Sequence, residues 1–112
     1  MWAGGGERTG REIAGSSEIM IGQLTIHLRL PGCTSLKEKR GRLKPLLNGL
    51  HKKFNLSVAE MDRQDMWQEA VIACALVNND GRQIQRSLQA VVNWVEGNWS
   101  DGDVIDEKIE II

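Results

Sequence analysis

Between residues 21 and 30, apolar and polar side chains alternate, and this pattern constrains the fold more than any other feature of the chain. The side chains of one side are all aliphatic: Leu24, Ile26, Leu28 and Leu30. Such an alternation predicts a β-strand with one buried face and one open face. Pro31-Gly32 would end this strand. The capping box Ser35-x-x-Glu38 then predicts that a helix begins directly after the turn.

The rest of the chain switches between helical and strand periodicity in the same manner. After residue 35, apolar side chains form one helical stripe: Leu36, Leu43, Leu47, Leu50 and Phe54. Gly41 and Pro45 interrupt this helix, and we expect a bend there but not two helices, because the stripe keeps its phase. The remaining elements are expected in this order: a strand at 55–61, a strand at 67–77, a helix that begins at Asn79 or Asp80 and ends at Gly97, and a strand at 104–112.

The predicted order β-α-β-β-α-β corresponds to the ferredoxin-like split fold, an α+β sandwich. Because crossovers between parallel strands are right-handed, the four-stranded antiparallel sheet takes the order 4-1-3-2, with both helices on one face. This topology brings three connections to one end of the molecule: the loop at 31–35, the hairpin at 62–66 and the turn at 98–103. A site built from several segments is expected at that end.

Composition excludes several classes of protein. Fourteen Lys and Arg against fifteen Asp and Glu leave a net charge of −1, so the chain as a whole is not a generally basic nucleic-acid binder. No apolar window approaches the roughly 20 residues that cross a bilayer, so no membrane partner is expected. A length of 112 residues suits one domain.

The cysteines and histidines predict no metal site. A zinc site needs about four ligands, and Cys33 and Cys74 are far apart in the sequence. Cys74 lies in an apolar run and is expected to be buried, whereas Cys33 follows a turn and could be exposed. With no disulfide framework, the chain is expected in a reducing compartment, the cytoplasm. We find no motif for a cofactor or a small-molecule ligand.

Residues 1–19 are rich in glycine and hold only scattered apolar side chains. We expect this segment to be a disordered leader, or to lie upstream of the true start at Met20. A single folded domain would then comprise residues 20–112. The alternative is a transit peptide; such peptides are poor in acidic residues, and the acidic side chains of this segment argue against it: Glu7, Glu12 and Glu18.

Four blocks of sequence carry a family resemblance: MIGQLTIHLRLPG at 20–32, SLKEKR at 35–40, FNLSVAE at 54–60 and DRQDMWQ at 62–68. They resemble the YlxP-like family of small uncharacterised bacterial proteins, and the likeness runs from Met20 to Ile112. The resemblance implies a ferredoxin-like fold and supplies no catalytic residue. Because genes of this family often lie beside those for translation initiation and ribosome maturation factors, it also implies a bacterial cytoplasmic protein linked to ribosomes or RNA.

A charge asymmetry is the clearest functional signal. Segment 29–53 holds eight Lys and Arg against one Glu, whereas segment 96–112 holds six Asp and Glu against one Lys. The basic residues are the candidate nucleic-acid contacts: Arg29, Lys37, Lys39, Arg40, Arg42, Lys44, Lys52 and Lys53. They would contact phosphates, with the helix amides near Ser35 as an additional anion site. The alternative, which stays open, is a solvated helix face attracted to the acidic strand of the same chain.

Arg40 is also a candidate for a structural role. It projects close to the apolar stripe, near the end where the 62–66 hairpin turns. Its aliphatic stem could cover the core while its guanidinium pairs with Asp62 or Asp65. We favour this pairing over a phosphate contact.

Base stacking, as in RNA-binding modules of the same topology, is not expected. Such modules display aromatic side chains on the central strands. Here the first and third strands would display no Phe, Tyr or Trp: their residues on this face are Thr25, His27, Arg29, Val71, Ala73 and Ala75. RNA binding would therefore act through the phosphate backbone.

The sheet face without helices is largely apolar and built from small side chains: Ser57, Ala59, Met61, Val71, Ala73, Ala75 and Val77. Contiguous apolar surfaces of this kind mark interfaces, so the second hypothesis is a homodimer or an adaptor for a protein partner. The alternative is a mildly apolar sheet face in contact with water.

Enzymatic activity is the weakest hypothesis. The best candidate cluster would combine carboxylates of the second strand and its hairpin with one histidine: Glu60, Asp62, Asp65 and His27. General acid–base chemistry needs such groups in a pocket, and carboxylates in turns more often cap backbone amides. We therefore predict a non-enzymatic binding module.

Overall fold

The computed structural model describes residues 18–61 and 66–112. It contains these elements: β1 (Met20–Arg29), α2 (Leu36–Lys53), β2 (Ser57–Met61), β3 (Glu69–Asn78), α3 (Gly81–Asn98) and β4 (Asp103–Ile111). The predicted order β-α-β-β-α-β is confirmed. Most of the predicted leader and the predicted turn at 62–65 lie outside the described residues.

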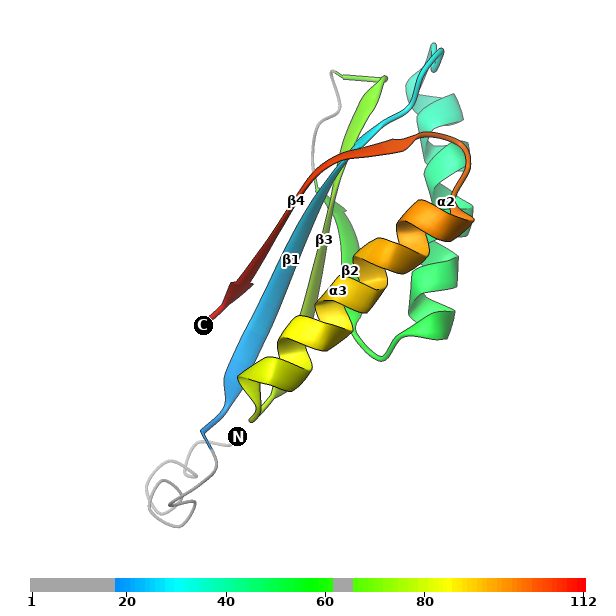
Figure 1. The fold of residues 1–112 in the computed structure, drawn as a ribbon. Helices are drawn as coiled ribbons and strands as arrows, with labels where there is room; N and C mark the ends of the chain where they lie inside the picture. Colours follow the sequence, from blue (N-terminus) through cyan, green and yellow to red (C-terminus); the bar gives the residue numbers. More distant parts are fainter. Residues whose placement is uncertain (1–17, 62–65) are drawn as a thin grey trace, which may run out of the picture.

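The four strands form one sheet in the order β2-β3-β1-β4, in which all neighbouring pairs are antiparallel. This is the predicted order 4-1-3-2 read from the opposite edge. Both helices pack on the same face, with α3 over β1 and β4 and α2 toward β2 (Figure 1). The α+β sandwich is therefore confirmed.

The core lies between the sheet and the helices. As the alternation predicted, β1 buries one side completely: Leu24, Ile26 and Leu28, followed by Leu30. The inner face of α3 covers them with aliphatic side chains at helical spacing: Ile84, Leu88, Val91, Val92 and Val95. Asp80 is the N-cap of α3, and its side chain accepts a hydrogen bond from the Arg82 amide at 2.9 Å. No helix within the described residues is long and apolar enough to cross a membrane.

Two predicted details of the helices need correction. The predicted end of the second helix at Gly97 is wrong, because α3 continues to Asn98 and Trp99 is its C-cap. The first helix begins at the predicted cap, Ser35, and runs through Pro45 without interruption. Its buried side, however, is not the predicted stripe.

The buried side of α2 consists of Lys39, Leu43, Leu46 and Leu50. At 100° per residue, the centre of this side is about 40° away from the centre of the predicted stripe. The close contact with α3 accounts for this orientation, because a Cβ at Gly49 would come within 2.6 Å of the Trp94 ring. The Phe54 ring also meets Trp94 edge-on, with 6.2 Å between the ring centres. Consequently Lys39 points inward and Arg40 outward.

Candidate functional site

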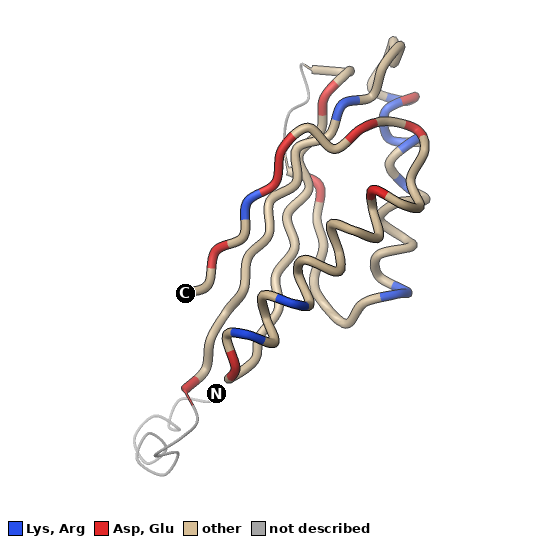
Figure 2. Tube along the Cα trace, viewed as in Figure 1, with Lys and Arg blue, Asp and Glu red and all other residues tan. Residues whose placement is uncertain are grey.

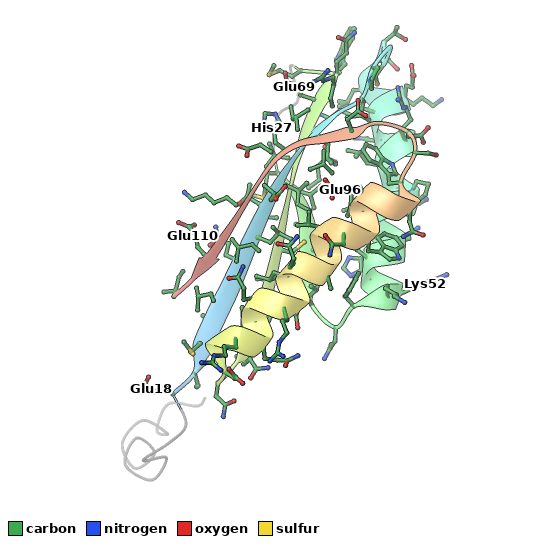
Figure 3. The ribbon with its side chains drawn as sticks, viewed as in Figure 1. Glu18, His27, Lys52, Glu69, Glu96 and Glu110 are labelled. Carbon is green, nitrogen blue, oxygen red and sulfur yellow. The ribbon has the colours of Figure 1, made fainter. Side chains whose placement is uncertain are left out.

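The outer side of α2 carries four exposed cations, which we call the basic ridge: Lys37, Arg40, Lys44 and Lys52. They repeat with helical spacing on the side away from the buried leucines. Figure 2 shows that cations gather in the first turns of this helix, and Figure 3 shows that Lys52 points away from the sheet. Lys53 is exposed at the helix end, one residue beyond Lys52. Five of the eight predicted phosphate contacts are thus exposed on α2.

Ridge cations form no ion pair with any other residue in 18–61 or 66–112; the ion pairs of α2 involve Lys39 and Arg42 instead. The acidic residues of the C-terminal segment follow β4 and the turn before it (Figure 2). The strand itself occupies the edge of the sheet opposite β2, whereas α2 packs toward β2; the turn before the strand meets α2 at Arg42. The ridge is therefore a positive surface whose cations have no ion-pair partner within the described part of the protein.

Lys39 does not belong to this surface, so its predicted phosphate contact is wrong. Its side chain is 0% exposed, because position 39 lies one helical turn before Leu43 on the buried side. The ammonium Nζ donates a hydrogen bond to the carbonyl oxygen of Met66 at 3.0 Å and lies 3.9 Å from a carboxylate oxygen of Glu60. This lysine connects α2 to β2 and to the segment before β3.

The guanidinium of Arg42 is also used in contacts within the protein, which corrects its predicted role as a phosphate contact. Its guanidinium donates to the carbonyl oxygen of Pro31 at 3.0 Å and to that of Asp101, and lies 3.5 Å from the Glu38 carboxylate. In return, the indole nitrogen of Trp99 donates to the Arg42 carbonyl oxygen at 3.2 Å. The loop after β1, helix α2 and the turn after α3 are joined at this one residue. The predicted meeting of the 31–35 loop and the 98–103 turn at one end is confirmed, while residues 62–65 of the predicted hairpin lie outside the described residues.

The predicted anion site at the start of α2 is filled by the chain's own carboxylate. Glu38 accepts hydrogen bonds from the Thr34 amide at 3.2 Å and from the Thr34 hydroxyl at 3.0 Å. The Ser35 hydroxyl accepts from the Glu38 amide at 3.0 Å, as the capping box predicted. A phosphate at this position would compete with the Glu38 carboxylate. We therefore do not count the amides at the start of α2 as part of the candidate phosphate-binding surface.

Glu38 should carry a pH dependence that can be measured. The hydrogen bond from the Thr34 amide, then that from its hydroxyl and the charge of Arg42, hold the pKa of Glu38 below its usual value. A carboxyl whose pKa falls on folding stabilises the folded chain above its unfolded-state pKa, and this contribution is lost as pH falls through the folded-state pKa. We therefore expect the stability difference between wild type and Glu38→Gln to shrink on acidification.

Urea unfolding of both proteins at several pH values between about 7 and about 3 would measure this difference. Glu96→Gln, on the exposed side of α3, is the matched control. A difference between wild type and Glu38→Gln that stays constant with pH would contradict the assignment.

Arg40 is exposed on the ridge, and its predicted partners Asp62 and Asp65 lie outside the described residues. The cation that enters the interior near the hairpin is instead its neighbour, Lys39. The helical spacing of Lys39 from Leu43 and Leu46 could have indicated that Lys39 is on the buried side. The sequence also offers a second stripe made only of apolar residues, which predicts a different buried side.

Arg29 is displayed on the opposite side of the molecule from α2. It is the last residue of β1, and its neighbours in the sheet are Glu69 and Asp103. The eight predicted phosphate contacts therefore divide into an exposed helical group, two structural cations and one residue on the sheet face without helices, which we call the open sheet face.

All the predicted interface residues lie on the open sheet face, where the register aligns them in rows: Ser57 beside Ala75, Ala59 beside Ala73 and Met61 beside Val71. Val77 continues β3 beyond them and is 66% exposed. A shallow hollow of about 400 Å³ lies over the small side chains. As predicted, the central strands display no Phe, Tyr or Trp side chain here; the one aromatic ring on them is the imidazole of His27.

The candidate acid–base cluster does not assemble within the described residues. His27 lies on the open sheet face, where its Nε2 atom is 2.9 Å from a Glu69 carboxylate oxygen (Figure 3). Glu60 neighbours the buried Ile72 in the register and therefore belongs to the opposite side of the sheet. The other two members, Asp62 and Asp65, lie outside the described residues.

Neither cysteine is available for chemistry. Cys33 is fully buried, so its expected exposure is wrong, and Cys74 is buried as predicted. Burial raises the pKa of the Cys74 thiol to about 11, which leaves it protonated and unreactive at neutral pH. Within residues 18–61 and 66–112, no three His, Cys, Asp or Glu side chains are placed to hold a metal ion.

Comparison with known proteins decides the family. The family described as "Protein of unknown function (DUF503)" matches residues 21–109. The chain belongs to this family. A Bacillus subtilis member of YlxP type, an "Uncharacterized protein YlxP", is 35% identical over 77 residues, which cover 69% of this chain and 84% of the relative. The YlxP-like resemblance is thereby confirmed for this DUF503 member.

One solved structure shares the fold of this DUF503 protein at low sequence identity. The de novo designed protein Foldit4 superposes with a TM-score of 0.51 and 12% identity, over 85% of this chain and 97% of the designed one. A cofactor-independent oxygenase from Streptomyces nogalater reaches a TM-score of only 0.44 at 7% identity, over 82% and 90% of the two chains. The first likeness supports the fold alone, and the second supports no conclusion about activity.

Proposed function

We propose that this protein is a non-enzymatic module that binds RNA, including ribosomal RNA, through the basic ridge of α2. The observation that carries the proposal is the exposure of Lys37, Arg40, Lys44 and Lys52 on one side of a helix, without an ion pair to another described residue. At 1.5 Å per residue, this line of cations extends over about 22 Å. Each cation that neutralises a phosphate releases condensed counterions, which is the main source of sequence-independent affinity.

The proposed mode of binding is contact with the phosphate backbone. Recognition of bases in single-stranded RNA relies on aromatic stacking platforms, and β1 and β3 display no Phe, Tyr or Trp on the open sheet face, where the single imidazole of His27 is paired with Glu69. The acidic β4 would repel phosphates from the far edge of the sheet. Binding should therefore tolerate many sequences and depend strongly on salt. We include a cytoplasmic location in the proposal, because the family resemblance implies a protein linked to ribosomes.

Reversing the ridge charges is the direct test. The triple variant Lys37→Glu, Arg40→Glu and Lys44→Glu should bind ribosomal RNA roughly 10- to 100-fold more weakly at low salt. The slope of log affinity against log salt should fall by about 2–3, because about 0.7–0.9 counterions are released per neutralised phosphate. Fluorescence anisotropy between about 50 and 200 mM salt measures both quantities. Lys39 and Arg42 are left unchanged because the fold depends on them.

The matched control changes the net charge equally at other exposed cations: Arg82→Glu, Arg86→Glu and Lys108→Glu. These residues lie on α3 and β4, away from the ridge. If the control weakens binding as much as the ridge variant, net charge rather than the ridge governs affinity. An unchanged affinity and slope in the ridge variant would refute the proposal outright.

A further inference from the structure

We propose that the open sheet face binds a second copy of this chain, so that the protein is a homodimer packed sheet to sheet. The two helices cover only the other face (Figure 1). The open sheet face is left with large apolar side chains in contact with solvent. Ile21 is 43% exposed, Met61 45% and Val77 66%. This inference does not depend on RNA binding, which uses the opposite side of the molecule.

The face complements itself in shape. Across β2 and β3, the middle row is Ala59 beside Ala73, with small side chains on one side of it and larger ones on the other. The small row is Ser57 and Ala75, and the large row is Met61 and Val71. A two-fold axis that crosses the strands at the middle row would place the large row of each copy on the small row of the other. The hollow of about 400 Å³ over the small residues would then receive the Met61 side chain of the second copy.

The charges on the face also favour a second copy. None of the residues in these three rows of β2 and β3 is charged, so two such surfaces meet without repulsion. The charged side chains of the same face lie outside these rows: Asp106, Lys108 and Glu110 on the edge strand β4, and Arg29 and Glu69 at one end of β1 and β3. An uncharged centre with a charged rim is the usual composition of a protein interface. A highly charged partner such as RNA finds no complement at this centre.

The area of the face is sufficient for a dimer. Three strands of nine or ten residues and one of five, about 4.8 Å apart and rising about 3.3 Å per residue, present roughly 540 Å² per copy. Two copies would bury about 1,100 Å², which is just above the roughly 1,000 Å² that a biological interface should exceed. The dimer should therefore form, and its mass should depend on concentration.

Light scattering and sedimentation of the full chain over a range of concentrations would test this. We expect the wild type to reach twice the 12.5 kDa of one chain. Ala73→Glu places two carboxylates against each other at the axis and should restore the mass of a monomer. Ala90→Glu, on the exposed side of α3, is the matched control and should remain a dimer. A wild type that stays monomeric, including one that instead captures a different protein on this face, would overturn the proposal.

A cysteine variant keeps the test decisive if Ala73→Glu impairs folding. Because Ala73 would lie opposite its counterpart at the axis, across two sheets about 10 Å apart, a short bis-maleimide should cross-link Ala73→Cys into a dimer, whereas Ala90→Cys should not be cross-linked. The two native cysteines are buried and would not interfere. Equal cross-linking of both variants, or none at position 73, would rule out the proposed axis.

Discussion

Lys39→Glu is expected to lower the free energy of unfolding by about 3–5 kcal/mol, whereas Arg40→Glu should lower it by less than about 0.5 kcal/mol. The two changes reverse the same charge at neighbouring positions of α2. The Lys39 side chain is fully buried against the Met66 carbonyl oxygen and the Glu60 carboxylate, so a glutamate there would bring a buried carboxylate close to two oxygen acceptors. Arg40 is exposed on the basic ridge, where a glutamate remains in water.

Urea unfolding at one fixed protein concentration measures both variants, since dimerisation would make stability depend on concentration. Lys39→Met separates the loss of the ammonium from the added negative charge, and it should cost about 1–3 kcal/mol because the Met66 oxygen loses this donor. Equal losses in Lys39→Glu and Arg40→Glu, or a larger loss in the latter, would mean that Arg40 is the inward cation. That result would restore the orientation predicted from the sequence.

The strands and their faces could be predicted because a period of two allows only two faces. Once Leu24, Ile26 and Leu28 are buried, every odd residue of β1 must lie on the open sheet face, and the antiparallel register extends this to β3. The predicted interface residues therefore all lie together. Their environment required no knowledge of distant contacts.

Helix α2 could not be oriented in the same way, because two stripes about 40° apart were available to it. One is entirely apolar and includes Leu36 and Leu47; the other includes Lys39 and Leu46. The second is buried because Trp94 of α3 sits on Gly49 and because the Lys39 ammonium finds a carbonyl oxygen 27 residues away. Neither contact can be recognised from local periodicity, so tertiary packing, and not the apolar pattern of the helix, decides which stripe is buried.

For the same reason, the sequence predicted a basic surface but not which cations belong to it. A count of charges in segment 29–53 treats Arg42 and Lys44 alike. In the structure Lys44 is exposed, while Arg42 donates to carbonyl oxygens of Pro31 and of Asp101, which is 59 residues away. Every residue supplies a backbone carbonyl oxygen, so the residue types in the sequence do not mark these acceptors. Only the folded topology brings them to one guanidinium.

Gly102→Ala is expected to have the second large effect on stability. Gly102 lies in the turn whose Asp101 carbonyl oxygen accepts from Arg42. A Cβ at this position would overlap the backbone carbonyl oxygen of Arg29 and lie 2.8 Å from the Trp99 ring. Because backbone cannot move aside as a flexible side chain can, the turn would have to shift, at a cost of about 2–3 kcal/mol. Gly97→Ala is the matched control, since nothing lies within 4 Å of its Cβ, and alanine in this last turn of α3 should stabilise by about 0.5–1 kcal/mol.

Thermal unfolding should separate the two glycine variants clearly, because 1 kcal/mol corresponds to a shift of about 4–8 °C in Tm for a domain of this size. Gly102→Ala should melt at least about 10 °C below wild type, and Gly97→Ala slightly above it. The shift should also weaken the contacts that the turn makes with α2, where Trp99 donates to the Arg42 carbonyl oxygen. Ring-current shifts of the Trp99 indole proton would report this loss by NMR. A Gly102→Ala protein as stable as wild type would show that the turn does not pack against β1, and with it the account of how Arg42 joins three segments would fail.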